Sequence, residues 1–327
     1  MNPTSLLYLA LFPLCFCLCV LGERLLLPML SRLAKQPIYA DGPRWHLKKS
    51  GTPTMGGIAF VLAICLCSLL TLPFLFRNGN AKEGVSLVLS LFFPICNALI
   101  GFVDDRTKLL RKENAGLSPR QKLLLQALVG SLYLYLRARL IRSAPVFSFA
   151  SVDVRLGFWY YPISLFLILG IVNCANLTDG VDGLASSVAF AVGISLFYLC
   201  RTVSVECATL SLCLMAGALG FLCFNLHPAR IFMGDTGSLF FGALICSILF
   251  SLENPLLLLL FGGVYVIEGV SVVLQVVSYK LTGRRIFLMA PLHHHLEKRG
   301  WSENRIAITA MLVTLCLSMV GALVWRL

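Results

Sequence analysis

Charged residues are scarce in this chain of 327 residues, since lysine, arginine, aspartate and glutamate together make up only 13% of it. Soluble domains have about 25% charged and about 45–50% apolar residues, whereas 58% of this chain is hydrophobic. So few charges cannot cover the surface of a soluble fold of this size, and a lipid bilayer must therefore be a large part of the solvent. The composition excludes secreted modules, cytosolic enzymes of the Rossmann type and free nucleic-acid-binding proteins.

Three other signals are missing. The 13 cysteines include no Cys-x-x-Cys pair and nearly all lie inside apolar runs, so they predict neither a disulfide framework nor a zinc site. The first residues have no basic stretch and no cleavage site, so we expect no secretory signal. We find no internal repeat and no long linker, and we expect residues 1–327 to form a single membrane domain.

Apolar runs of about 17–25 residues predict membrane-spanning helices. The chain contains ten, at residues 5–22, 55–76, 85–103, 121–141, 158–175, 184–200, 206–224, 236–252, 255–279 and 306–325. The sequence therefore predicts an all-α, polytopic membrane protein with about ten transmembrane helices and both termini on the same side.

Positive charge is distributed unevenly between the two faces of this predicted bundle. The loops after the odd-numbered runs hold 18 of the 27 lysines and arginines, and the opposite face holds eight. Because basic loops accumulate on the cytoplasmic side, we expect the odd loops to be cytoplasmic and both termini to be external. The same effect explains the net charge of +12, so we expect no nucleic-acid partner.

Four unusually polar segments lie in these odd loops or at their helix ends, so we expect the active site on the cytoplasmic face. The first contains Asp104 and Asp105 at the end of the third run. Adjacent carboxylates at a membrane boundary stay ionised only with compensating cations or a metal ion. An acidic pair solvated by the neighbouring basic side chains is the alternative interpretation.

The second segment follows the fifth run and reads Asn-Cys-Ala-Asn-Leu-Thr-Asp-Gly-Val-Asp-Gly over residues 173–183. Its polar residues recur at every third position and therefore share one side of a helical turn. Its glycines let a ligand approach the backbone closely. A helix cap would need one such polar residue, whereas four are present.

The third and fourth segments add an aromatic ring, another acid and three histidines. In residues 225–238, Asp235 precedes a helix whose N-terminus attracts phosphate, and Phe232 offers a face on which a base can stack. The fourth contains His293, His294 and His295. Zinc is one interpretation of this run, although adjacent helical residues cannot all face one ion, and contacts to phosphate or a hydroxyl group are another.

Carboxylate and amide oxygens favour Mg²⁺ or Mn²⁺ over zinc, and Mg²⁺ usually binds through one or two carboxylates and substrate phosphates. Together with the nearby cations, they predict metal-assisted phosphoryl transfer at the membrane surface. A site embedded in the membrane implies that one substrate is a lipid.

These motifs closely resemble those of the phospho-N-acetylmuramoyl-pentapeptide transferase family of bacteria, a branch of the polyprenyl-phosphate N-acetylhexosamine-1-phosphate transferases. The resemblance runs in order through nearly the whole chain, over residues 50–57, 104–105, 173–183, 225–238 and 291–301. The histidine run followed by Gly300 and Trp301 is similar to this branch rather than to its GlcNAc-1-phosphate relatives.

The resemblance implies a reaction in which undecaprenyl phosphate attacks UDP-N-acetylmuramoyl-pentapeptide, releases UMP and forms lipid I with Mg²⁺ as cofactor. It also implies a location in the bacterial cytoplasmic (inner) membrane with periplasmic termini, and a homodimer. The nearest alternative is a sister transferase that uses UDP-GlcNAc. A transporter or channel is the alternative from another class, but it would place carboxylates near the midplane of broken helices.

The resemblance also implies residue roles. Asp235 would be the leading metal ligand, with Asp104 and Asp105 as further candidates; Asp104 would be the base, and His293 would be a catalytic residue. Because the second pKa of a phosphate is about 6, the lipid phosphate needs no strong base, and direct attack is simpler than a covalent aspartyl intermediate.

The remaining implied contacts are to substrate. The residues that contact the nucleoside would be Asn176, Asp179, Asp182, Gly183 and Phe232, with Phe232 stacked on uracil. The cations that face the pyrophosphate would be Lys108, Lys112 and Lys122, although a solvated surface position is the alternative for Lys112. The other residues around the substrate and its phosphates would be Lys49, Thr54, Asn225, Gln275, Ala290 and His294. Arg106 departs from the family, which usually has an aromatic residue there. Glu268 is seven residues from Gln275 on one predicted helix face, and we expect a polar groove there.

Overall fold

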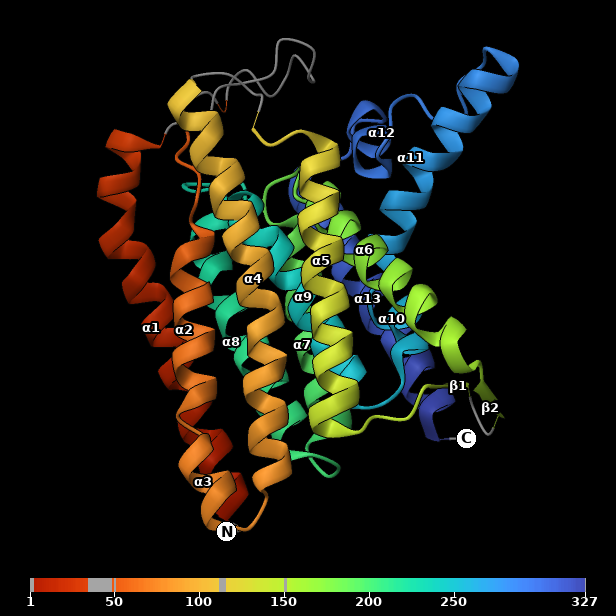
Figure 1. Ribbon diagram of the computed structural model, residues 1–327. Helices are drawn as coiled ribbons and strands as arrows, with labels where there is room; N and C mark the ends of the chain where they lie inside the picture. Colours follow the sequence, from red (N-terminus) through yellow and green to blue (C-terminus); the bar gives the residue numbers. More distant parts are fainter. Residues whose placement is uncertain (1–2, 35–48, 50, 112–115, 150–151, 327) are drawn as a thin grey trace.

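Each of the ten predicted runs is helical over most of its length in the computed structural model (Figure 1), which describes residues 3–34, 49, 51–111, 116–149 and 152–326. The first helices are α1 (Pro3–Leu33), α2 (Gly57–Leu69), α3 (Leu72–Arg77), α4 (Ala81–Arg111) and α5 (Pro119–Leu136), which ends in a π-helical turn, Arg137–Ile141. The later helices are α6 (Tyr160–Thr178), α7 (Leu184–Cys200), α8 (Val205–Asn225), α9 (Gly234–Ser251), α10 (Leu258–Phe261), α11 (Gly263–Thr282), α12 (Leu292–Lys298) and α13 (Glu303–Arg326).

The helices confirm the predicted all-α, multi-pass membrane architecture. Within the described residues, nine helical segments are long and apolar enough to cross a membrane, and α2 and α3 together form one of them. The tenth predicted run is α7, an apolar helix of 17 residues. At 1.5 Å per residue α7 is about 25 Å long, slightly shorter than the hydrocarbon core of about 30 Å.

Two predicted helix ends were wrong, because α1 continues past residue 22 to Leu33 and α4 also continues past its apolar run, and one predicted run proved to be interrupted. Helix α4 does not end at residue 103 but continues to Arg111, so Asp104 and Asp105 lie inside it. Lysine, arginine and leucine are good helix formers, so the helix continues where the hydrophobic signal stops. The ninth run is not one helix, because α10 and α11 are separated at Gly262.

A short β-hairpin was not predicted. Strand β1 (Val146–Phe149) pairs with β2 (Val152–Arg155) in antiparallel register, with Val146 opposite Arg155. Four residues per strand leave too little alternation for a sequence signal. The hairpin precedes α6 at the edge of the bundle (Figure 1).

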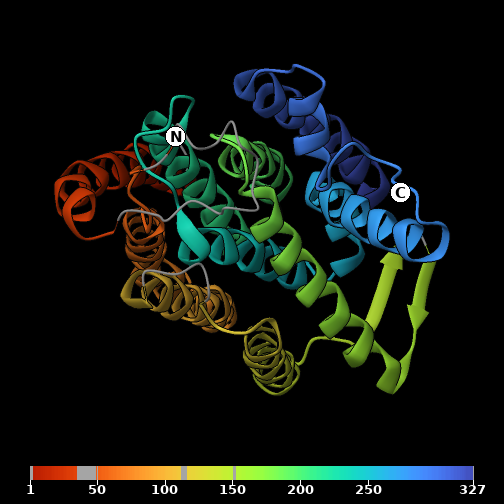
Figure 2. The same cartoon turned by 90° about the horizontal axis from the view of Figure 1, so that it is seen from above.

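Helix α9 lies at the centre of the bundle, between α4 and α6 (Figure 2). Most of its side chains are buried, as are those of α8 beside it. A Cβ atom at Gly101 of α4 would overlap the backbone of Asp235 and Thr236, so only glycine allows this approach. The close contact brings the carboxylates of α4 beside the first turn of α9.

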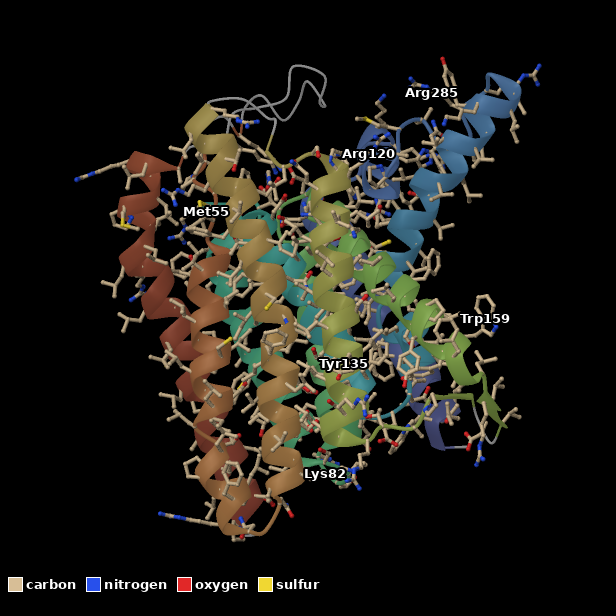
Figure 3. All side chains as sticks on the ribbon, viewed as in Figure 1. Met55, Lys82, Arg120, Tyr135, Trp159 and Arg285 are labelled. Carbon is tan, nitrogen blue, oxygen red and sulfur yellow. The ribbon has the colours of Figure 1, made fainter. Side chains whose placement is uncertain are left out.

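The two ends of the bundle differ in what they carry. The start of α1 and the end of α13 lie at the same end, which agrees with the prediction that both termini share one side (Figure 1). Figure 3 shows Arg120, in the first turn of α5, at the opposite end from Lys82, in the first turn of α4. The end of α4, the start of α5 and the short helix α12 therefore share the end opposite to the termini.

Candidate active site

A cavity of about 1290 Å³ opens at the end of the bundle where α4 ends and α5 begins. Loops and helix ends from distant parts of the chain line it. Most of the residues implied by the resemblance line this one cavity, namely Lys49, Thr54, Asp104, Asp105, Lys108, Lys122, Asn176, Asp179, Asp182, Asn225, Phe232, Asp235, His293 and His294.

Four implied residues are not among the lining residues. Gly183, Gln275 and Ala290 lie outside the lining, and Lys112 lies outside the described residues. Gly183 instead adopts a positive φ of 74° at the start of α7, a conformation that glycine adopts without strain. The Gln275 amide binds the backbone of Ile286 and Phe287, so it holds the segment after α11.

Asp104, Asp105 and Asp235 form a group of carboxylates that can hold a metal ion. One oxygen from each of them lies within 4.8 Å of the others. The first two come from α4 and the third from the first turn of α9. All three donors are hard oxygen atoms, which suit Mg²⁺ or a similar ion better than zinc.

Two lysines partly compensate the negative charge of this group. The Asp235 carboxylate lies 3.0 Å from the Lys108 Nζ atom and 2.7 Å from the Lys122 Nζ atom, and it accepts a hydrogen bond of 2.8 Å from the Asn176 amide. Lys108 also lies 2.6 Å from Asp104. The predicted compensating cations are therefore present beside the acidic pair. The solvated-surface alternative concerned Lys112, which lies outside the described residues.

Asp105 holds the start of α9. Its carboxylate accepts hydrogen bonds from the backbone N–H groups of Asp235 (3.0 Å) and Thr236 (2.9 Å) and from the Thr236 hydroxyl group (2.7 Å). The two backbone N–H groups are among those that the first turn of a helix leaves unpaired. Asp105 therefore fixes the position of Asp235, a role that the sequence reasoning did not assign to it.

A second polar cluster surrounds Asp182 on the other side of the cavity. Its Oδ1 atom lies 2.7 Å from Lys49, and its Oδ2 atom accepts from the Ala229 N–H group and lies 2.9 Å from the His227 Nδ1 atom. Burial raises the pKa of Asp182, but the hydrogen bond and charge of Lys49 outweigh it, with help from His227 and Ala229, and lower the pKa below its ordinary value.

Two further residues of this region have contrasting surroundings. Burial raises the pKa of Asp179 well above its ordinary value, and the negative charges nearby add to the effect. The Asn225 amide is fully engaged within the protein, because it accepts from the Gly183 N–H and Ser186 hydroxyl groups and donates to the Ile231 carbonyl group. Asn225 therefore holds the glycine turn in place.

The three histidines bind three different partners. His293 is 1% exposed at its side chain, its Nδ1 atom lies 3.1 Å from Glu268, and its Nε2 atom faces Gly180 without a hydrogen-bond partner. His294 pairs with Glu297, and His295 accepts from the Leu288 N–H group. The run therefore offers no common centre for zinc. Glu268 pairs with His293, and the polar groove expected between Glu268 and Gln275 stays a prediction.

The sequence reasoning missed Glu303 and did not single out His227. Both contact the Asp182 cluster. Glu303 begins α13 directly after a Trp-Ser pair, a position at which an acid is typical of any helix start. Only the fold brings it to the site, since it follows Asp182 by 121 residues.

The fold and the site define a multi-pass membrane transferase, and comparisons of sequence agree. Residues 86–253 match glycosyl transferase family 4. Residues 49–61, which contain the cavity residues Lys49 and Thr54, match signature 1 of the phospho-N-acetylmuramoyl-pentapeptide-transferases.

Full-length relatives carry the same name. The phospho-N-acetylmuramoyl-pentapeptide-transferase of Caldanaerobacter subterraneus is 42% identical over 308 residues, which is 92% of this chain and 93% of the relative. That of Clostridium botulinum (strain Eklund 17B) is 40% identical over 92% of this chain and 91% of its own length. That of Geobacillus sp. (strain WCH70) is also 40% identical, over 94% of both chains. The chain belongs to the phospho-N-acetylmuramoyl-pentapeptide-transferase family.

Proposed function

We propose that this protein transfers phospho-N-acetylmuramoyl-pentapeptide from its UDP-linked donor to undecaprenyl phosphate, releasing UMP and forming lipid I. The observation that carries the proposal is the carboxylate group of Asp104, Asp105 and Asp235 with two lysines, in one large cavity at one end of a membrane bundle. Such a site suits a reaction between a charged soluble donor and a phosphate on a lipid.

The residues present fit Mg²⁺ as the cofactor. Asp235 would be the leading ligand of the ion, with Asp104 and Asp105 as further ligands, because one oxygen of each lies within 4.8 Å of the others. When bound, Mg²⁺ supplies positive charge that stabilises and orients the transferring phosphoryl oxygens. Lys108 and Lys122, which neutralise Asp235 here, would also bind the pyrophosphate of the donor.

The phosphoryl transfer follows from this arrangement. An oxygen of the lipid phosphate attacks the β-phosphorus of the donor and forms a new P–O bond, while the bond from that phosphorus to the bridging oxygen breaks and UMP leaves. Asp104 accepts the remaining proton of the lipid phosphate when one is present, although most of that phosphate is already ionised at neutral pH. Direct attack needs no covalent intermediate on an aspartate.

The other side of the cavity would bind the nucleoside and the sugar. Phe232 would stack on uracil, and Asp179 and Asp182 would contact the nucleoside near Lys49. Asn176, which binds Asp235, would contact the nucleoside from the carboxylate side. His293 directs its unpaired Nε2 atom toward the Gly180 turn, where a substrate hydroxyl or phosphate oxygen would accept or donate a hydrogen bond.

The charge distribution supports an orientation in the bacterial inner membrane with the cavity on the cytoplasmic face. The nucleotide donor is polar, so its site must face the aqueous compartment that contains it. A homodimer is a further expectation from the family.

Comparing donors tests the proposal. Purified protein in detergent, with Mg²⁺ and undecaprenyl phosphate, should release UMP from UDP-N-acetylmuramoyl-pentapeptide and not from UDP-GlcNAc. Omitting the lipid should stop the release. Release of UMP from UDP-GlcNAc but not from UDP-N-acetylmuramoyl-pentapeptide would assign the chain to the sister transferases. The absence of UMP release with both donors would favour a transporter.

A further inference from the structure

Glu303 joins three loops that meet at one side of the cavity. Its Oε2 atom accepts a hydrogen bond of 2.5 Å from the Lys49 Nζ atom and one of 2.8 Å from the backbone N–H group of Asp182. Its Oε1 atom lies 3.3 Å from the His227 Nδ1 atom. The first residue of α13 therefore contacts the Lys49 segment, the glycine turn before α7 and the loop after α8.

The contacts of Glu303 are largely shielded from water. The side chains of Glu303, Lys49 and Asp182 are only 13%, 17% and 3% exposed. Lys49 lies between two carboxylates, and His227 also lies between the same two acids. Solvent-exposed ion pairs contribute little free energy to a protein, and pairs shielded from water contribute more. These contacts are therefore expected to hold their partners more firmly than a surface salt bridge does.

An acidic residue in the first turn of a helix is favourable in any protein, because it interacts with the helix dipole. That explanation does not account for the direction of this side chain. Both Glu303 oxygens contact segments distant from α13, at residues 49, 182 and 227. The acid therefore acts between segments rather than within its own helix.

The turn that Glu303 holds is itself part of the cavity wall. Gly180 of this turn faces the Nε2 atom of His293, and Asn225 holds Gly183 at the other end. Without Glu303, the Asp182 N–H group would lose its acceptor and Lys49 would retain one carboxylate partner. Both changes fall on the nucleoside side of the cavity, away from the carboxylates that face the phosphoryl group.

We propose that Glu303 is a positioning residue for the nucleotide donor, holding Lys49 and the 179–183 turn in their binding geometry. The inference rests on the proposed function and adds a residue to it. Glu303 acts through its two partners and does not take part in phosphoryl transfer. It therefore controls the affinity for the donor, while the lipid acceptor and the chemical step depend on other residues.

The test separates the two substrates in steady-state kinetics. Glu303→Ala should raise the KM for UDP-N-acetylmuramoyl-pentapeptide by about tenfold to a hundredfold, the effect of losing hydrogen bonds to charged groups. The KM for undecaprenyl phosphate should stay within about twofold, since uniform binding is lost only for the donor. Glu303→Gln keeps the shape of the side chain and one acceptor oxygen, so its donor KM should lie between those of Glu303→Ala and the wild type. Glu253→Gln, an exposed site in the turn after α9, is the matched control and should match the wild type.

A double-mutant cycle provides the second readout. If Glu303 acts through Lys49, the effects of Glu303→Ala and Lys49→Met on the donor KM should be clearly less than additive. Additive effects, or equal losses toward both substrates, would overturn the inference. If Glu303→Ala protein does not fold, the isosteric Glu303→Gln variant decides by the same criteria.

The wild-type assay keeps this inference apart from the proposed function. A wild-type protein that releases UMP while Glu303→Gln and Glu303→Ala keep a normal donor KM would contradict only the role of Glu303. A wild-type protein that does not use this donor would contradict the proposed function and this inference with it.

Discussion

Replacing Asp105 should destabilise the protein by an amount that the structure lets us calculate. Asp105→Ala removes the acceptor of three hydrogen bonds from the first turn of α9. A buried donor left without an acceptor costs about 1–3 kcal/mol, and losing a helix N-cap costs typically about 1 kcal/mol. Because the adjoining cavity admits water that can satisfy some of these donors, we expect a loss near the low end, about 3 kcal/mol in all.

Thermal unfolding in detergent measures this loss. The matched control is Asp104→Ala, since among the described residues Asp104 accepts one backbone N–H bond, from Leu117, besides its contact with Lys108. We expect Asp105→Ala to unfold at a clearly lower temperature than Asp104→Ala, with Asp105→Asn between Asp105→Ala and the wild type because it retains one acceptor oxygen.

The comparison also decides what kind of residue Asp105 is. If Asp105→Ala is as stable as the wild type, the three hydrogen bonds do not stabilise the start of α9 and our reasoning is wrong. If Asp104→Ala is less stable than Asp105→Ala, then Asp104 rather than Asp105 is the carboxylate that contributes more to the stability of the fold.

Three other predictions concern binding, catalysis and pH. Phe232→Leu should raise the donor KM by about tenfold or more, because stacking on a base contributes about 1–3 kcal/mol to binding. Phe232→Trp keeps an aromatic face and should leave the KM unchanged, and rate measurements over a range of donor concentrations test both variants. Lys122→Met removes one of the two cations beside Asp235 and should lower kcat/KM by about a hundredfold without a matching loss of stability. A kcat/KM equal to that of the wild type would exclude a role for Lys122 in the reaction. The pKa of Asp182 is lowered, so its pair with Lys49 contributes stability above the ordinary Asp pKa of about 3.9 and loses it as the pH falls below that value. Acid unfolding should therefore show an extra loss of stability below about pH 4 in the wild type that Asp182→Asn lacks.

The sequence predicted the membrane bundle and the meeting of its polar segments for a physical reason. Hydrophobic length locates the helices, and because successive crossings alternate in direction, all odd loops lie on one face. Asp104, Asn176 and Asp235 belong to segments on that face, and the structure brings them together with Lys108 and Lys122. The separation of polar and apolar segments was therefore sufficient to predict that these segments meet at one end of the bundle.

The sequence did not predict contacts that depend on packing. Glu303 looks like an ordinary helix start until the fold brings it to Lys49, 254 residues earlier in the chain. Asp105 looks like a second copy of Asp104, and although both line the cavity, only the close approach at Gly101 shows that Asp105 holds the start of α9. Hydrophobic periodicity contains no information about which of two adjacent acids points where.

The most direct test of the account is UMP release by wild-type protein and by Asp235→Asn, each with undecaprenyl phosphate, UDP-N-acetylmuramoyl-pentapeptide and a titration of Mg²⁺. We expect UMP release by the wild type to require both the lipid and Mg²⁺, and to fall at least about a hundredfold in folded Asp235→Asn protein. Full activity of Asp235→Asn, or release by the wild type without any divalent ion, would contradict it.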